Sequence, residues 1–186
     1  MNDILAVDQH DKWLYKFGLA LHVGIDPFIG RICWIKIWWT NKNPRLICSY
    51  YIEWIHENGG CMLQLLASKY QTNLYNESKL LDTVLITQSD PGSENYGIAK
   101  AHSYLRQWGD PELQGTIQHR WMRQKKNVKP EIAWSQFRRR FAPGFEDLMD
   151  EGVREGWYHP DVVLERYFLA QLLDFNTTDQ LYHNTV

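Results

Sequence analysis

The sequence predicts an α/β domain in which an antiparallel hairpin is extended by further strands and covered by helices. Short runs of β-branched and aromatic residues alternate with longer segments whose apolar residues recur at helical spacing. The chain has 186 residues, of which 44% are apolar and 23% charged, so it can bury the core of one domain.

The first forty residues supply three predicted strands. These are the runs Ile4–Asp8, Leu19–Asp26 and Arg31–Thr40, and the last two form a hairpin around the turn sequence PFIG. The third run, RICWIKIWWT, is largely apolar on both faces. We therefore expect helices to cover this strand on each side.

Helices and shorter strands alternate after the hairpin. Pro44 begins a helix through about Glu57, because Pro suits a first helical turn and the Gly59–Gly60 pair suits its end. The later elements are a strand at Asp82–Gln88, a helix from Tyr96 or Gly97 to Trp108, a strand or extended link at Thr116–Trp121, and helices at Glu131–Phe141, Phe145–Gly152 and Pro160–Leu173. This order predicts a sheet with an antiparallel hairpin and a parallel addition.

No repeat or linker divides the chain. We expect residues 1–173 to form one core domain and residues 174–186, which are polar and weakly patterned, to form a weakly structured tail. Residues 61–81 fit poorly, either as an extra helix and loop or as an insertion, and we favour the insertion.

Composition excludes several classes of protein. No apolar run reaches the roughly eighteen residues of a membrane span, and the acidic amino terminus lacks the basic region of a signal peptide. The three cysteines form no C-x-x-C pair, which argues against a disulfide scaffold or a zinc finger. We expect an intracellular protein that is not secreted and has no membrane partner.

Positive charge is concentrated in one stretch although the net charge is only −2. From His119 to Arg140 there are eight Lys or Arg and a single acid, Glu131. Such a segregated basic stretch is typical of nucleic-acid binding, and a solvated surface helix is the alternative. The candidate nucleic-acid-binding residues are Lys125, Lys126, Lys129, Ser135, Arg138 and Arg139.

Three acids have contexts that suit divalent-metal chemistry. Asp8 follows the apolar run ILAV, Asp90 leaves a strand at a Pro-Gly turn, and Glu131 opens the basic helix. Two-metal phosphoryl transfer needs carboxylates converging on cations about 3.5–4 Å apart, with positive charge nearby for the phosphates. We predict that these three residues are catalytic metal ligands.

Each acid also has a structural interpretation. Asp90 suits an Asx turn before a helix, Asp8 could pair with Lys12, and Glu131 complements a helix dipole. Asp26 rivals Asp8, since it also ends an apolar strand, but the Pro and Gly that follow favour a turn. His10 and Asp11 are further potential ligands.

Other signals are weaker. Nine Trp and ten Tyr could supply base-stacking platforms, but most lie at core periodicity, which favours packing. The sequence contains no G-x-S-x-G, Walker loop, H-E-x-x-H or G-x-G-x-x-G motif, which removes most other enzyme classes.

The three acids lie in segments that together resemble a known family. VDQHDKW, the GIDPFIGRICWIKIWWT hairpin, SDPGSENYGIAKAHSYLRQW and NVKPEIAWSQFRRRF are similar to the integrase core domain of retrovirus-type integrases and DDE transposases. The greatest similarity is to integrase-core proteins encoded by fungal and other eukaryotic genomes. The resemblance covers most of residues 4–170, apart from the insertion.

The resemblance implies a ribonuclease H-like fold, with a mixed five-stranded sheet and helices on both sides. It places the family's metal-binding triad at Asp8, Asp90 and Glu131, and it matches Asp26 to a recurrent acid that is not catalytic. The implied cofactor is a pair of Mg²⁺ or Mn²⁺ ions, and the implied reaction is cleavage and strand transfer of DNA phosphodiesters. DNA is then the expected partner, the nucleus an expected location, and a homo-oligomer is left open.

Two alternatives use the same residues. A catalytically inactive or domesticated remnant would bind nucleic acid or protein without cutting, and a ribonuclease H-like nuclease would cut without strand transfer. The chain departs from the family pattern after Gly59–Gly60, where about twenty residues precede the next strand.

Overall fold

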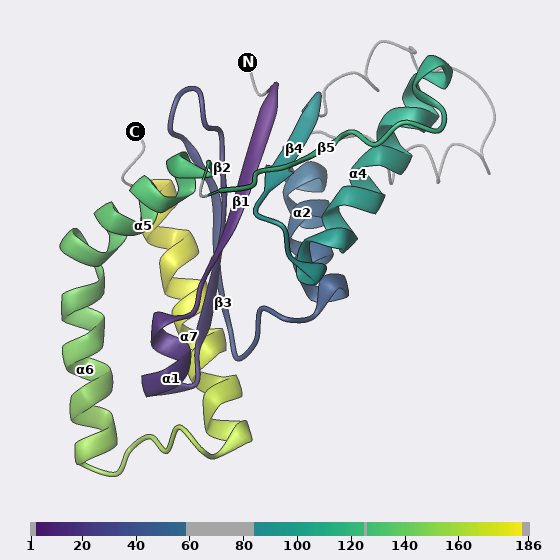
Figure 1. The fold of residues 1–186 in the computed structure, drawn as a ribbon. Coiled ribbons are helices and arrows are strands. Elements are labelled where there is room, and N and C mark those ends of the chain that lie inside the picture. Colours follow the sequence, from purple (N-terminus) through teal and green to yellow (C-terminus); the bar gives the residue numbers. More distant parts are fainter. Residues whose placement is uncertain (1–2, 59–83, 125, 184–186) are drawn as a thin grey trace.

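Five strands form one mixed sheet in the order β3-β2-β1-β4-β5 (Figure 1). The computed structural model describes residues 3–58, 84–124 and 126–183. The strands are β1 (Ile4–His10), β2 (Ala20–Ile25), β3 (Ile32–Trp38), β4 (Ile86–Ser89) and β5 (His119–Trp121). β1, β2 and β3 pair antiparallel, whereas β4 lies parallel to both β1 and β5. The predicted α/β class, with an antiparallel hairpin and a parallel addition, is confirmed.

Helices cover both faces of this sheet (Figure 1). They are α1 (Lys12–Phe17), α2 (Pro44–Glu57), α4 (Tyr96–Gly109), α5 (Val128–Arg140), α6 (Ala142–Arg154) and α7 (Val163–His183), with short 3₁₀ turns η2 (Ser93–Asn95) and η3 (Pro111–Leu113). α2 and α4 pack on one face, and α1, α5, α6 and α7 pack on the other.

β3 contributes to the hydrophobic core on both faces. Trp34 packs with α2 and α4, whereas Ile35 and Ile37 pack in the core that contains α5 to α7. The expectation that this strand is covered on each side is therefore confirmed.

Two elements differ from the prediction. α1 is a short helix that the sequence pattern did not indicate; Trp13 and Phe17, one turn apart, are buried, and Gly18 ends the helix in the left-handed conformation. α7 continues past Leu173 to His183, where we expected a weakly structured tail. No Gly or Pro in DFNTTDQLYH interrupts the helix. The expected insertion at 61–81 lies outside the described residues.

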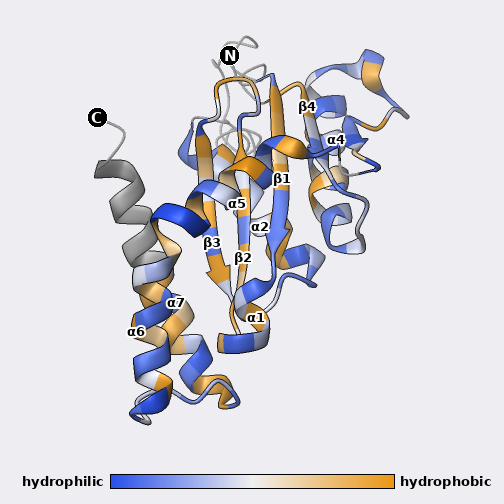
Figure 2. Cartoon of the chain, turned by 60° about the vertical axis from the view of Figure 1, so that its left-hand side comes forward, coloured by the Kyte–Doolittle hydropathy of each residue, from blue (hydrophilic) through white to orange (hydrophobic). Residues whose placement is uncertain are grey.

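β1 occupies the middle of the sheet and changes character along its length. Figure 2 shows it hydrophobic at its start and hydrophilic at its end, which reflects the sequence ILAVDQH. Polar side chains are therefore presented from a central strand of the sheet. Within the described residues no helix is both long and apolar enough to cross a membrane.

Candidate functional site

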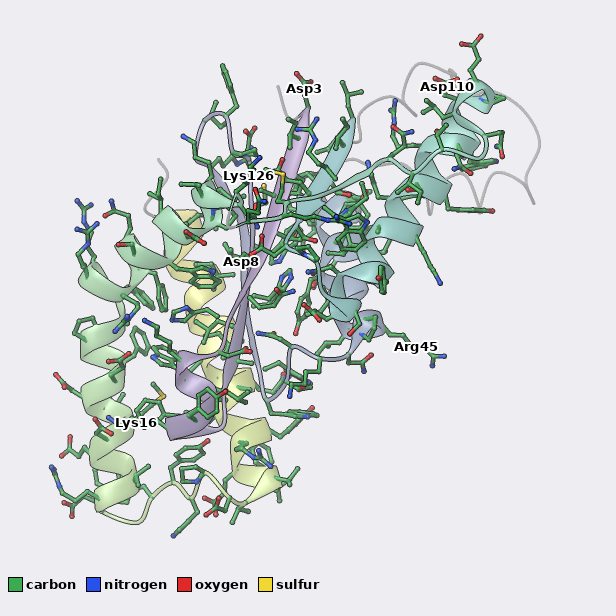
Figure 3. The ribbon with its side chains drawn as sticks, in the orientation of Figure 1. Asp3, Asp8, Lys16, Arg45, Asp110 and Lys126 are labelled. Carbon is green, nitrogen blue, oxygen red and sulfur yellow. The ribbon has the colours of Figure 1, made fainter. Side chains whose placement is uncertain are left out.

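The parallel pairing of β1 and β4 brings Asp8 and Asp90 to neighbouring positions. Ala6 pairs with Gln88, and each aspartate lies two residues further along its strand. Since side chains alternate between faces, this register directs both carboxyl groups toward the face that α5 covers. Figure 3 shows Asp8 at the centre of the molecule. Acids 82 positions apart in sequence thus lie next to each other.

Asn127 fastens the start of α5 to these two strands. Its side-chain amide donates to the Val7 carbonyl on β1 at 2.9 Å, and its oxygen accepts from the Gln88 amide at 3.5 Å. Asn127 is the N-cap residue of α5, yet its fully buried side chain makes no cap hydrogen bond. Its usual capping role is replaced by the long-range bond, which places the first turn of α5 over the acids.

The first two turns of α5 add two further side chains to the site. Glu131 lies in the first turn as an exposed acid, as the sequence predicted. One turn later the indole N–H of Trp134 donates to Asp8 Oδ2 at 3.1 Å. The His10 ring stacks on Trp134 with a centroid distance of 4.9 Å. α5 therefore carries both a third carboxylate and a hydrogen-bond donor for the first.

The negative charges of neighbouring acids raise the pKa values of Asp8 and Asp90. Burial, followed by the negative charges of Asp90 and then Glu131, raises the pKa of Asp8 to about 7, although the Gln9 backbone N–H and the Trp134 indole act against this. Burial and the charge of Glu131 also raise the pKa of Asp90. Mutually repelling carboxylates of this kind are stabilised when a cation binds among them.

One oxygen of Asp90 is buried without a hydrogen-bond partner. The residue as a whole is partly exposed, but its Oδ1 is buried and accepts no hydrogen bond from any described residue. A buried, unsatisfied carboxylate oxygen is costly unless a donor or a cation reaches it. Together with Asp8 it forms an all-oxygen donor set, which suits Mg²⁺ or Mn²⁺.

The carboxylates do not close on a common point. Among the described residues, no group of three or more His, Cys, Asp or Glu side chains is arranged to hold a metal ion. The oxygen donors of Asp8 and Asp90 nevertheless suit a divalent cation, and Glu131 is exposed in the first turn of α5.

An open pocket of about 550 Å³ lies beside the acids. It is lined by Asp8, Gln9, His10, Lys12, Glu131, Trp134, Ser135, Arg138 and Arg139. Three of the six predicted nucleic-acid-binding residues, Ser135, Arg138 and Arg139, therefore share a pocket with two of the predicted catalytic acids. Asp90 does not line it.

The other three basic candidates are placed differently. Lys126, which is labelled in Figure 3, and Lys129 are exposed near the start of α5. Neither lines the pocket. Lys125 lies outside the described residues.

The rival acid Asp26 forms a turn, as its sequence context favoured. It is buried, and its carboxylate accepts hydrogen bonds from the backbone N–H groups of Phe28 and Ile29. Asp11 accepts a hydrogen bond from the Asn41 side chain at 3.1 Å. Both carboxylates already have protein donors, unlike Oδ1 of Asp90.

His10 lines the pocket in its neutral form. Burial, followed by the charges of Lys12 and Arg138, lowers the pKa of His10 to about 4. Its stacking on Trp134 holds the ring flat against α5.

Gln9 and Asn95 support the backbone at Asp90, and the sequence pattern did not indicate these contacts. The Gln9 side chain on β1 donates to Asn95 Oδ1 at 2.7 Å, and Asn95 in turn donates to the Asp90 carbonyl at 3.1 Å. The polar residue at position 9, directly after Asp8, was the available signal.

No protein-family model, curated protein or solved structure matches this chain.

Proposed function

We propose that this chain is the catalytic core of an integrase- or DDE-transposase-like polynucleotidyl transferase with a ribonuclease H-like fold. Its substrate would be DNA, its place of action the nucleus, and its cofactor two Mg²⁺ or Mn²⁺ ions. Two observations support the proposal: β1 and β4 pair so that Asp8 and Asp90 are neighbours, and Asp8 and Glu131 line one pocket together with Lys12, Arg138 and Arg139.

Asp8 and Asp90 would hold the ions, with Glu131 as the third ligand. When bound, two divalent ions activate an attacking oxygen and stabilise the leaving oxygen of an in-line displacement. Because the pKa of Asp8 is raised to about 7, this carboxyl group is partly protonated near neutral pH. It would lose that proton on binding a cation. Trp134 keeps the carboxylate oriented through its indole hydrogen bond.

The cationic wall of the pocket would hold the phosphate backbone. Lys12, Arg138 and Arg139 line the same pocket as Asp8 and Glu131, and Ser135 adds a hydroxyl donor. A phosphodiester in this pocket would meet both the carboxylates of Asp8 and Glu131 and these phosphate-binding groups. Positioning of this kind supplies much of the catalysis in phosphoryl transfer.

The test is metal-dependent nicking of supercoiled plasmid DNA by the full chain and by Asp90→Asn. Asn has the same shape but lacks the charge that a divalent ion needs, so we expect nicking to fall by at least about 100-fold. Asp110→Asn is the matched control, because Asp110 lies at the far end of α4 (Figure 3) and its oxygen still accepts from the Glu112 N–H.

The outcomes separate the candidate functions. Equal nicking by wild type and Asp90→Asn would refute the catalytic role. DNA binding without nicking by the wild-type protein in either Mg²⁺ or Mn²⁺ would favour a catalytically silent binding module. Joining of a DNA 3′ end to the plasmid, in addition to nicking, separates a transferase from a ribonuclease H-like nuclease.

A further inference from the structure

An exposed aromatic ring lies at the start of α4, close to Asp90 along the backbone. Tyr96, the first residue of α4, has 54% of its surface exposed and belongs to neither hydrophobic core. Its ring meets Trp121 at a centroid distance of 5.1 Å and an interplanar angle of 78°. A perpendicular contact occupies at most one face of the tyrosine ring, so a flat partner can stack on the other.

Two contacts fix this aromatic pair next to Asp90. Trp121 pairs with Ser89 across β4 and β5, and Asp90 is the next residue after Ser89. On the other side, Asn95 bonds to the Asp90 carbonyl, and Tyr96 follows Asn95 directly. The aromatic pair is therefore close to Asp90 along the backbone but lies on the face of the sheet that α2 and α4 cover, whereas the Asp90 side chain points toward the face of α5.

Positive charge accompanies the aromatic pair. Arg120 and Arg123 flank Trp121, and Lys126 follows on the segment that leads to α5; all three are exposed. Aromatic rings interleaved with cations along an extended segment are typical of surfaces that bind single-stranded nucleic acid. The charge favours a polyanion over an apolar peptide as the partner.

We propose that Tyr96 stacks on an unpaired nucleobase of the DNA strand whose backbone enters the candidate site. This inference rests on the proposed function and narrows its substrate: single-stranded segments or unpaired ends are preferred to continuous duplex. Bases inside a duplex have both faces covered by their neighbours, so only a base outside the stack can reach the ring. Trp121 supports Tyr96 through the perpendicular contact of their rings, and Arg120 and Arg123 bind phosphates of the same strand.

Fluorescence anisotropy with a labelled oligothymidylate strand and with a duplex of equal length tests the proposal, in EDTA so that no cleavage occurs. Wild type should bind the single strand more tightly than the duplex. Tyr96→Ala should weaken single-strand binding by at least about 5-fold, because one base–aromatic stack is lost, and should leave duplex binding close to wild type. Tyr96→Phe keeps the ring and should behave as wild type.

Tyr104→Ala is the matched control, because Tyr104 lies on the same helix with 66% of its surface exposed. A strand containing 2-aminopurine gives a direct readout, since its fluorescence is quenched when the base stacks; the quenching should be lost only in Tyr96→Ala. Equal single-strand affinity and quenching in wild type and Tyr96→Ala would overturn the stacking role. That failure differs from failure of the proposed function, which would appear as nicking that survives Asp90→Asn.

Discussion

The carboxyl group of Asp8 lies in the central strand of the sheet, and its protonation is coupled to folding. Burial and neighbouring negative charge raise its pKa to about 7, well above the ordinary value of 3.8. Between these values the folded protein holds a proton that the unfolded chain releases. Asp8 therefore contributes less to stability as pH rises from about 4 to about 7.

Replacing Asp8 by Asn should stabilise the metal-free protein at alkaline pH. Asn removes the buried charge and can still accept the Trp134 hydrogen bond, so we expect a gain of roughly 1–3 kcal/mol near pH 8 that disappears near pH 4. Urea unfolding in EDTA at both pH values measures it. Asp110→Asn should show no such pH-dependent difference; parallel wild-type and Asp8→Asn profiles would contradict the burial of this charge.

Helix α5 combines most of the groups that the site needs. Glu131 and Ser135 lie one turn apart, Arg138 follows in the next turn, and Trp134, on the same side of the helix, bonds to Asp8. The position of the helix depends on Asn127 at its start. Both the attachment and the charged surface of α5 can be tested separately.

Asn127→Ala should loosen α5 from the sheet. It leaves the buried Val7 carbonyl and the Gln88 amide without this partner, so we expect a loss of about 1–3 kcal/mol in unfolding free energy and reduced nicking at a temperature where the variant is folded. Asn43→Ala is the control: it removes an N-cap on α2 and should leave nicking unchanged. Wild-type nicking by a folded Asn127→Ala would show that this bond does not position the site.

The double variant Arg138→Ala and Arg139→Ala should bind DNA more weakly and with less salt dependence. Each arginine that neutralises a phosphate releases counterions, so the slope of log K against log salt should fall by up to about 2. Lys42→Ala with Arg45→Ala removes the same charge at the start of α2, away from α5 (Figure 3), and should leave the slope close to wild type. An unchanged slope in the α5 variant would exclude these arginines from the DNA interface.

Across the whole molecule, buried histidines oppose the effect of Asp8. Burial lowers the pKa of His22 to about 3 and the pKa values of His102 and His119 to about 4. Thr87 and Ser89 bond to the two ring nitrogens of His119, and Tyr51 bonds to His102, so these rings are built into the polar interior.

The protein should therefore lose stability as pH falls from about 6.5 toward 4. In this range the unfolded chain takes up protons that the buried rings do not, and the single proton held by Asp8 offsets only one of them. The free energy of unfolding, measured by urea denaturation across this range, should decrease with a pH slope that corresponds to the uptake of more than one proton. His56→Gln, at an exposed position on α2, should leave the slope unchanged. A midpoint that rises on acidification would contradict the neutral burial of these histidines.

Local patterns predicted much of the architecture, because strand composition and helical periodicity depend on neighbouring residues. The hairpin and helices α2, α4 and α5 appear near their expected positions, and so does Asp90 directly after its strand. The supports of the site could not be predicted in this way. Asn127 contacts Val7 across 120 positions and Gln9 contacts Asn95 across 86, and such pairs are set by the packing of the whole domain.

The bond between Trp134 and Asp8 also makes the indole a spectroscopic probe of its neighbour. If the protein is produced with 5-fluorotryptophan, its nine tryptophans give a fluorine NMR spectrum small enough to assign by replacing Trp134 with Phe. The chemical shift of that single resonance then reports the proton on Asp8 or its replacement by a cation. Occupancy of the carboxylates can thus be followed in solution without nucleic acid and without turnover.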